Sequence, residues 1–176
     1  LGSVADSFLR NTSRTVLLFK GRSGVSKTVP VLFDRILVPV GEEHRAQEAI
    51  ARALDLGALH DAQYTLLHVA PAPTTLLASG FADELLDVPE DRATIDARLE
   101  SLAATLREKG HTVTTLVVEA PFVANEIIAQ ANAGGVDLVA MATAGPASVE
   151  RVFLGSIADK VIRKSELPTL CCSVRG

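Results

Sequence analysis

Hydrophobic residues follow two alternating patterns along the chain, namely short continuous runs and longer stretches with helical spacing. The short runs are rich in Val, Ile and Leu and contain few polar residues. Such runs are typical of strands that are covered on both faces of a sheet. They predict strands at Thr15–Lys20, Phe33–Val40, Gln63–Val69, Thr112–Val118, Val136–Met141 and Thr169–Val174.

Between these runs, apolar residues recur every three or four positions, which places them along one side of a helix. The four stripes run from Ala46 to Leu54, from Ile95 to Leu106, from Val123 to Ala131 and from Ile157 to Ile162. We expect Gly110 to end the second helix and Gly134-Gly135 to end the third. The longer connection Pro71–Pro89 is expected to be partly helical over Leu76–Leu86.

Strands and helices alternate from Phe33 to Val174. This alternation predicts an α/β fold with a parallel sheet and helices on both faces. In such folds, ligands bind at the carboxyl ends of the strands where the strand order switches.

The two ends of the chain contain an internal repeat. Residues 1–20 (LGSVADSFLRNTSRTVLLFK) align without a gap with residues 154–173 (LGSIADKVIRKSELPTLCCS). The identical pairs are Leu1/Leu154, Gly2/Gly155, Ser3/Ser156, Ala5/Ala158, Asp6/Asp159, Arg10/Arg163 and Leu17/Leu170. We interpret residues 1–20 as a helix–strand remnant of a preceding domain, residues 21–32 as a linker and residues 33–176 as the main domain.

The segment GRSGVSKT, residues 21–28, is one residue away from a phosphate-binding P-loop, because Ser26 replaces the second glycine. A P-loop must open a helix whose N-terminus helps to hold the phosphates. Here Pro30 and an apolar strand follow, so we interpret the segment as a linker.

Composition and charge restrict the classes of function. The chain has 176 residues, a net charge of −4 and no Trp, and only 4% of its residues are aromatic. These values disfavour nucleic-acid binding, which requires a basic face and often stacking aromatics. No apolar run is long enough to span a membrane. The four histidines are scattered, so no metal site is expected, and His68 on a strand is expected to be a hydrogen-bonded structural residue.

The two cysteines, Cys171 and Cys172, are adjacent on a predicted strand. Neighbouring strand side chains point to opposite faces, which makes the two thiols poor partners for a disulfide or a metal. We interpret them as small buried apolar residues in a reducing, cytoplasmic protein.

From Phe33 onward, the chain resembles the universal stress protein family. The resemblance rests on FDRILVPV, on EAIARALDLGALHDAQYTLLHVAPAP, and on GVDLVAMATAG followed by VERVFLGSIADKVIRKSELPTLCCSV. It covers residues 33–174, and residues 1–20 as a partial copy. It implies a flavodoxin-like, adenine-nucleotide α-hydrolase-like sandwich with a five-stranded, mostly parallel sheet. It also implies that residues 1–20 end the first domain of a tandem member.

ATP-binding members of this family carry the motif G-x-x-G-x9-G-[ST], which falls here on Ala142, Gly145, Gly155 and Ser156. Glycines let backbone N–H groups approach phosphate oxygens closely, and the helix that starts at Gly155-Ser156 would direct its positive end at the anion. The resemblance therefore implies ATP, with Mg²⁺, as a ligand. The nucleotide-binding candidates are Pro39, Val40, Gly41, Val69, Met141, Ala142, Thr143, Gly145, Gly155, Ser156 and Ile157.

Three departures from the family pattern leave a second hypothesis open. Ala142 replaces the first glycine, Gly41 replaces an aspartate that helps to hold the nucleotide, and Glu119-Ala120-Pro121 replaces a Gly-x-Pro turn. Three roles remain open for Glu42 and Glu43: a substitute for the lost carboxylate, a charge that repels phosphate, or a solvated acidic first turn of the following helix. The first hypothesis is a stress-response module with ATP as a conformational ligand. The alternative is a dimerisation or protein-interaction module with a decayed ATP site. We expect no enzymatic activity in either case.

The repeated unit also leads to a prediction about assembly. A helix over 2–11 and a strand over 15–20 cannot bury their apolar faces alone. Family resemblance implies that last strands pair across a dimer. We therefore expect Thr15–Phe19 to pair with Thr169–Val174, in the same chain or in a neighbour, as a pseudo-dimer or homodimer.

Overall fold

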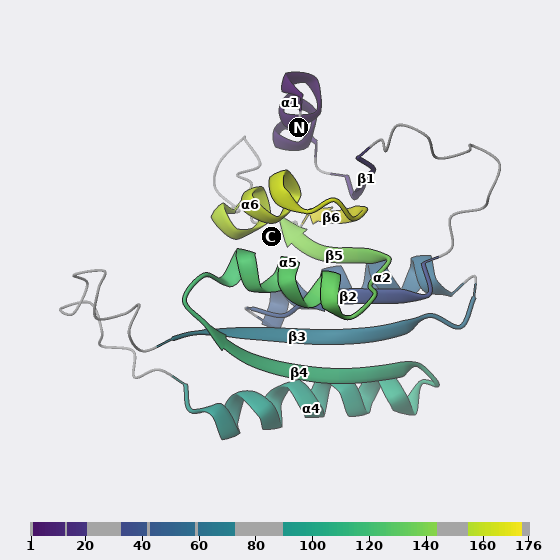
Figure 1. Cartoon of the computed structure of the whole chain (residues 1–176). Coiled ribbons are helices and arrows are strands. Elements are labelled where there is room, and N and C mark those ends of the chain that lie inside the picture. Colours follow the sequence, from purple (N-terminus) through teal and green to yellow (C-terminus); the bar gives the residue numbers. More distant parts are fainter. Residues whose placement is uncertain are drawn as a thin grey trace.

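The computed structural model describes residues 2–12, 14–20, 33–41, 43–58, 60–72, 90–143 and 155–173 (Figure 1). The expectations for the linker 21–32 and for Leu76–Leu86 lie outside these residues. The helices are α1 (Ser3–Asn11), α2 (Glu43–Gly57), α4 (Arg92–Glu108), α5 (Val123–Ala133) and α6 (Ser156–Lys164). The strands are β1 (Val16–Leu18), β2 (Arg35–Pro39), β3 (Gln63–Pro71), β4 (Thr112–Ala120), β5 (Leu138–Thr143) and β6 (Thr169–Ser173).

The strands form one sheet in the order β1-β6-β5-β2-β3-β4. The pairs among β2 to β6 are all parallel, whereas β1 pairs antiparallel with β6. The predicted α/β fold with a mostly parallel sheet is therefore confirmed. The sheet has six strands rather than the expected five, because β1 adds to the edge of the main-domain sheet beside β6.

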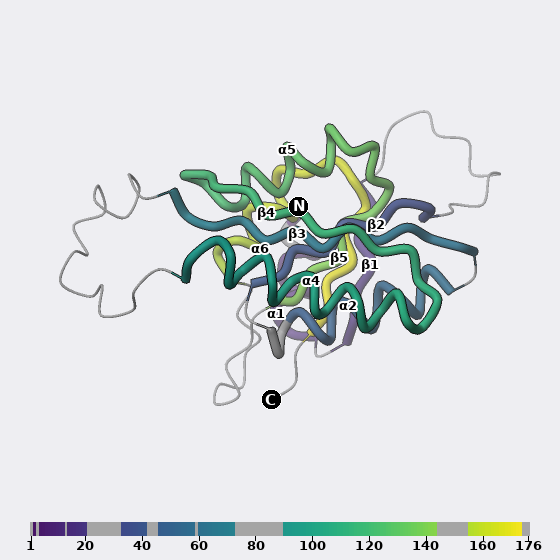
Figure 2. The backbone as a smooth tube through the Cα atoms, turned by 90° about the horizontal axis from the view of Figure 1, so that it is seen from below, coloured from purple at the N-terminus to yellow at the C-terminus, as the bar shows by residue number. Residues whose placement is uncertain are grey.

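Helices cover both faces of the sheet and create two core layers (Figure 2). One layer contains the apolar stripes of α2 and α4, including Ala49 and Leu99, packed on strand residues such as Leu66. The other contains α5 and α6, with Ile127 and Val161, and also Leu9 of α1. Helix α1 thus lies on the same face as α6, its counterpart in the sequence repeat.

Strand β5 begins at Leu138, two residues later than predicted. The chain between α5 and β5 is instead held by hydrogen bonds to neighbouring elements. The Val136 N–H donates to the Ala131 carbonyl at 3.2 Å, and the Asp137 N–H donates to the Arg35 carbonyl at 2.9 Å. The apolar Val136 therefore belongs to the turn that leads into the strand.

The predicted glycine stops of two helices are confirmed. Gly110 follows α4 with φ +90°, and Gly135 follows α5 with φ +62°. Only glycine adopts such left-handed conformations without a steric penalty, so both residues end their helices.

The adjacent cysteines lie on opposite faces of β6, as predicted. Cys171 belongs to the core layer of α5 and α6, and Cys172 belongs to the layer of α2 and α4. Both are buried, free thiols, and burial raises the pKa of each to about 12. At neutral pH both thiols are therefore protonated and act as apolar core residues.

Two expected absences concern the described residues only. None of the helices in that part of the chain has the length and apolar character to cross a membrane. Within the same part, His, Cys, Asp and Glu side chains do not gather in groups of three that could hold a metal ion.

Candidate functional site

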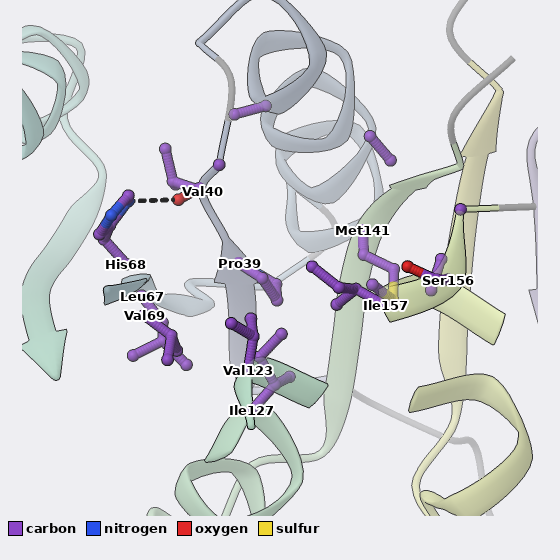
Figure 3. Close-up of a pocket in the computed structure, with 15 residues that line it drawn as sticks. Pro39, Val40, Leu67, His68, Val69, Val123, Ile127, Met141, Ser156 and Ile157 are labelled. Carbon is purple, nitrogen blue, oxygen red and sulfur yellow. Dashed lines mark hydrogen bonds between the residues drawn. The ribbon is translucent and has the colours of Figure 1, made fainter. Parts of the chain in front are cut away.

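A cavity of about 400 Å³ opens at the carboxyl ends of β2 and β5 (Figure 3). The central strand β2 lies between β5 and β3. The chain adds β3 and β4 on one side of β2 and β5 and β6 on the other, so the strand order switches at β2. This is the position at which open α/β sheets bind ligands. The lining residues come from β2 and the residues after it, β3, β5, α2, α5 and the start of α6. They are Pro39, Val40, Gly41, Ala46, Leu67, His68, Val69, Val123, Ile127, Met141, Ala142, Gly155, Ser156, Ile157 and Ala158.

Nine of the eleven predicted nucleotide-binding residues line this one cavity. They are Pro39, Val40, Gly41, Val69, Met141, Ala142, Gly155, Ser156 and Ile157. Thr143 does not line the cavity, and its buried hydroxyl donates to the Cys172 carbonyl at 3.1 Å. Gly145 and Glu42 lie outside the described residues, and the side chain of Glu43 does too.

The first turns of α5 supply a wall of the cavity that the sequence analysis assigned only to the core. Val123 and Ile127 are four residues apart on α5, so both side chains lie on the same helix face. With Leu67 and Val69 of β3 they form an apolar surface beside the end of β2 (Figure 3). The available signal was their position directly after β4, because helices that follow parallel strands begin at the carboxyl edge of the sheet.

The N-terminus of α6 provides the polar end of the cavity. Gly155 is the N-cap residue, with φ −57° and ψ 149°, and no side chain caps the helix there. The N–H groups of the first helical turn have no acceptor within a helix. Ser156 and Ile157, the first two residues of α6, line the cavity and are exposed. These donors and the helix dipole together suit an anion.

The end of β2 is held against β3 by both backbone groups of Val40. The Val40 N–H donates to the Leu67 carbonyl at 2.7 Å. His68 Nδ1 lies 2.8 Å from the Val40 carbonyl oxygen, which only accepts hydrogen bonds, so Nδ1 carries the proton. His68 is half-buried, and the prediction of a hydrogen-bonded structural histidine is confirmed.

Two departures from the family motif have different structural consequences. Glu119, which takes the place of the turn glycine, is an exposed residue of β4 and does not line the cavity. Gly41 lines the cavity and is exposed, and a Cβ atom added there would meet nothing within 4 Å. The aspartate position therefore has room for a side chain.

The described lining of the cavity contains no Asp, Glu, Lys or Arg. His68 is the one titratable side chain among these residues, and its Nδ1 proton is already donated to Val40. The described part of the cavity is thus an apolar cleft with backbone donors at one end. It can bind a flat apolar group attached to an anion, but it offers no pair of groups for acid–base chemistry.

Relatives with known sequences or structures point to one family. The chain is 29% identical over 142 residues to a universal stress protein of Methanocaldococcus jannaschii, an alignment that covers 79% of this chain and 81% of that protein. A universal stress protein structure from Archaeoglobus fulgidus superposes with a TM-score of 0.71 and 23% identity, covering 100% of this chain and 55% of that chain. Another A. fulgidus universal stress protein, solved in complex with dAMP, superposes with a TM-score of 0.57 and 16% identity over 80% of this chain and 98% of that one.

The family model described as the Universal stress protein family matches residues 32–173. This range includes every described element that lines the cavity. The match agrees with the fold, with the relatives and with the motif that Gly155 and Ser156 complete. The chain therefore belongs to the universal stress protein family.

Proposed function

We propose that this chain is a stress-response module that binds an adenine nucleotide, ATP in the first instance, in the cavity at the carboxyl ends of β2 and β5. The observation that carries the proposal is the combination of an apolar cleft of about 400 Å³ with the uncapped N-terminus of α6 at its edge. Ligand pockets of this size, with few polar groups in defined places, are typical of cofactor sites.

Each part of the cavity suits one part of the nucleotide. The apolar surface of Leu67, Val69 and Ile127 suits the base, because an aromatic ring gains free energy when it leaves water. The N–H groups at the start of α6 suit the phosphates. No described carboxylate lines the cavity, so Mg²⁺ would be held through the phosphate oxygens and water.

Two further facts support nucleotide binding. The chain belongs to the universal stress protein family, and a member with the same fold was solved in complex with dAMP. Predicted residues from four separate segments of the chain also line a single cavity. The choice of ATP over other adenine nucleotides rests on the family motif alone.

We infer that the nucleotide acts as a conformational ligand and that the protein is not an enzyme. The inference is supported by the described lining, which has no carboxylate or cationic side chain to activate water. His68 is a poor candidate for a general base through Nδ1, because that nitrogen donates its proton to Val40.

The alternative function is a dimerisation or protein-interaction module with a decayed ATP site. Gly41 favours this alternative, because the carboxylate of ATP-binding relatives is missing at a position that lines the cavity. Ala142 adds a methyl group where the motif has a glycine.

For either function, we propose that the protein is cytoplasmic and has no nucleic-acid or membrane partner. The two free thiols support the cytoplasmic location, and the net charge of −4 supports the absence of a nucleic-acid partner.

The test is a calorimetric titration of the nucleotide-stripped protein with Mg-ATP, with AMP and GTP as comparisons. We expect saturable ATP binding that the Ser156→Asp substitution weakens by roughly tenfold or more, because a carboxylate would repel the phosphates at the start of α6. An acidic residue in a first helical turn stabilises the helix, so this variant is expected to remain folded.

The matched control is Phe122→Ala. Phe122 is 65% exposed and precedes α5, but it does not line the cavity, so ATP affinity is expected to be unchanged. Absence of saturation at millimolar ATP by the folded protein would instead support the interaction module. Equal affinity of Ser156→Asp and the unmodified protein would exclude the proposed phosphate position.

A further inference from the structure

The contact between α1 and α6 contains four charged side chains that form a closed ring of ion pairs. Arg10 of α1 contacts Asp159 of α6 at 3.3 Å, and Arg163 of α6 contacts Asp6 of α1 at 2.5 Å. Within each helix, the arginine also contacts its own aspartate one turn away at 2.9 Å. We call these four residues the charge cluster. Its positive and negative charges balance.

The charge cluster reaches the first turn of α6, where the cavity has its polar end. Gly155, Ser156 and Ile157 line the cavity, whereas Asp159 does not. Asp159 lies in the same helical turn, and its N–H donates to the Gly155 carbonyl at 2.8 Å. It follows Ser156 by three residues, which is a rise of about 4.5 Å along the helix axis. Its carboxylate is therefore close to the N–H groups proposed to hold phosphates, although it lies outside the cavity.

The Asp159 carboxylate by itself opposes an anionic ligand at the start of α6. It draws on the same positive end of the helix dipole, and it repels phosphate directly. Two arginines neutralise it, because Arg10 contacts Oδ1 and Arg163 contacts Oδ2. Arg163 is shared with Asp6, so Arg10 supplies the charge that balances the cluster. The net charge beside the start of α6 thus depends on a side chain of α1.

Helix α1 itself is held by few buried contacts. Among its described side chains, only Leu9 is buried, and the short strand that follows pairs with β6 over Val16–Leu18 alone. Elements with few buried apolar contacts open at a low cost in free energy. The docking of α1 on α6 is therefore an equilibrium that a ligand can shift.

We propose that α1 regulates the nucleotide site through the charge cluster, with Arg10 favouring phosphate binding by neutralising Asp159. The inference rests on the proposed function, because it concerns the same site. Arg10 is a positioning residue, since it contacts Asp159 and does not line the cavity. Coupling between two binding events is reciprocal, so a bound nucleotide strengthens the docking of α1 by the same factor. Helix α1 is then the element that responds to the nucleotide as a conformational ligand.

This coupling is electrostatic, so it depends on the charge of the ligand and on salt. Without Arg10, the charge cluster carries one net negative charge beside the phosphates. An uncharged nucleoside is not repelled by this charge. Salt screens charges over a distance of about 10 Å at 0.1 M, so the effect of Arg10 decreases as the salt concentration rises. A purely structural role of Arg10 would show neither dependence.

The test is a calorimetric titration of the full chain and of Arg10→Gln, with Mg-ATP and with adenosine, at low and at high salt. We expect Arg10→Gln to weaken Mg-ATP binding roughly three- to tenfold at low salt and less at high salt. Its affinity for adenosine is expected to equal that of the unmodified protein. Arg10→Lys retains the positive charge, so it is expected to retain most of the Mg-ATP affinity.

Two further variants separate the charge cluster from general effects of charge. Asp159→Asn, added to Arg10→Gln, leaves only the neutral pair of Asp6 and Arg163, so it is expected to restore Mg-ATP affinity. Arg98→Gln is the matched control. Arg98 pairs with Glu90 at 3.0 Å on α4, a helix that does not line the cavity, so no change in affinity is expected.

Amide exchange measures the reciprocal effect on α1. Saturating Mg-ATP is expected to slow exchange in Ser3–Asn11 and Val16–Leu18 of the unmodified protein several-fold, because it strengthens the docking of α1. The slowing is expected to be smaller in Arg10→Gln. Exchange in α4 serves as the internal reference, because α4 contacts neither the cavity nor the charge cluster.

The possible failures are distinguishable. Equal Mg-ATP affinity of Arg10→Gln and the unmodified protein would overturn this inference and leave the proposed function standing. A loss that is the same for adenosine, or that Asp159→Asn does not restore, would assign Arg10 a structural role and also overturn it. Absence of nucleotide binding by the unmodified protein would overturn the proposed function, and this inference with it.

Discussion

Gly41 is the residue that most clearly distinguishes the two proposed functions. It lines the cavity, and a Cβ atom there would meet nothing within 4 Å. The Gly41→Asp substitution restores the carboxylate of ATP-binding relatives. We predict that it increases the affinity for ATP about tenfold, because one hydrogen bond to a charged group contributes about that much binding free energy. Calorimetric titration measures the change.

The matched variant for this prediction is Gly41→Asn, which has nearly the same shape without the charge. It is expected to improve affinity less than Gly41→Asp. If the two variants bind ATP equally well, the carboxylate has no role at this position. Loss of binding in both would mean that the open space beside Gly41 is needed by the ligand itself.

At the residue scale, the sequence predicted those site positions whose chemistry depends on the backbone. The motif spacing identified Gly155 and Ser156, which line the cavity as expected. Val123 and Ile127 were missed as lining residues, because an apolar side chain that faces a cavity and one that faces the core follow the same helical pattern. Thr143 is a related case, since strand alternation turns its hydroxyl away from the cavity and towards the Cys172 carbonyl.

At the element scale, the cap of α4 links the structure to pH. The Asp91 side chain accepts a hydrogen bond from the Thr94 N–H at 2.8 Å, and this bond lowers the pKa of the carboxyl below its ordinary value of 3.8. We predict that Asp91→Ala lowers the melting temperature at pH 7 by about 2–4 °C, the usual effect of losing one N-cap in a protein of this size. Thermal unfolding followed by circular dichroism measures it.

The same cap predicts a dependence on pH. Since the folded-state pKa of Asp91 is depressed, its ionised carboxylate adds stability at all pH values above 3.8, and the gain disappears as the pH falls through the lower folded-state value. The difference between the unmodified protein and Asp91→Ala is therefore expected to shrink below that pH. Asp91→Asn keeps a cap that does not titrate, so it should preserve stability at pH 7. A pH-independent difference would argue against the carboxylate.

Element types were predictable, whereas some element ends were not. All six strands were expected from their apolar runs, but β3 and β4 extend to Pro71 and Ala120, past the last residues of those runs. Pairing between the two strands continues to the Pro71–Ala120 pair, so partner strands rather than local hydrophobicity set these ends. The converse holds at Val136, because its N–H donates to the Ala131 carbonyl at the end of α5 and the residue therefore belongs to the turn before β5.

At the scale of the whole molecule, the sheet has one edge that arginines protect. Arg92 and Arg107 of α4 donate to the β4 carbonyls at 3.0 and 2.8 Å. We predict that the double variant Arg92→Ala, Arg107→Ala aggregates several-fold faster at 37 °C by light scattering, because open strand edges add further strands. Arg52→Ala with Arg98→Ala removes the same charge, and these arginines pair with Glu48 and Glu90 instead of with β4. Equal aggregation of the two double variants would assign the effect to net charge.

The pairing of β1 with β6 was expected from the sequence repeat together with the family resemblance, whereas its antiparallel direction was not predicted. The occurrence of this pairing within one chain was not predicted either, because residues 1–20 could equally have paired with a neighbour. The structure has the intrachain pairing, with Leu17 opposite Leu170. Strand–helix alternation predicted the parallel sheet of the main domain and the helices on both of its faces, but not the order of the strands.

That intrachain pairing has a consequence for mass action. A strand tethered to its own binding edge competes at an effective concentration on the order of millimolar. A second copy of the protein at micromolar concentration would have to displace β1 from β6 against this excess. Because β1 of the same chain outcompetes a second copy for the β6 edge, self-association through that edge is disfavoured. Two copies that associate in solution would therefore use other surfaces.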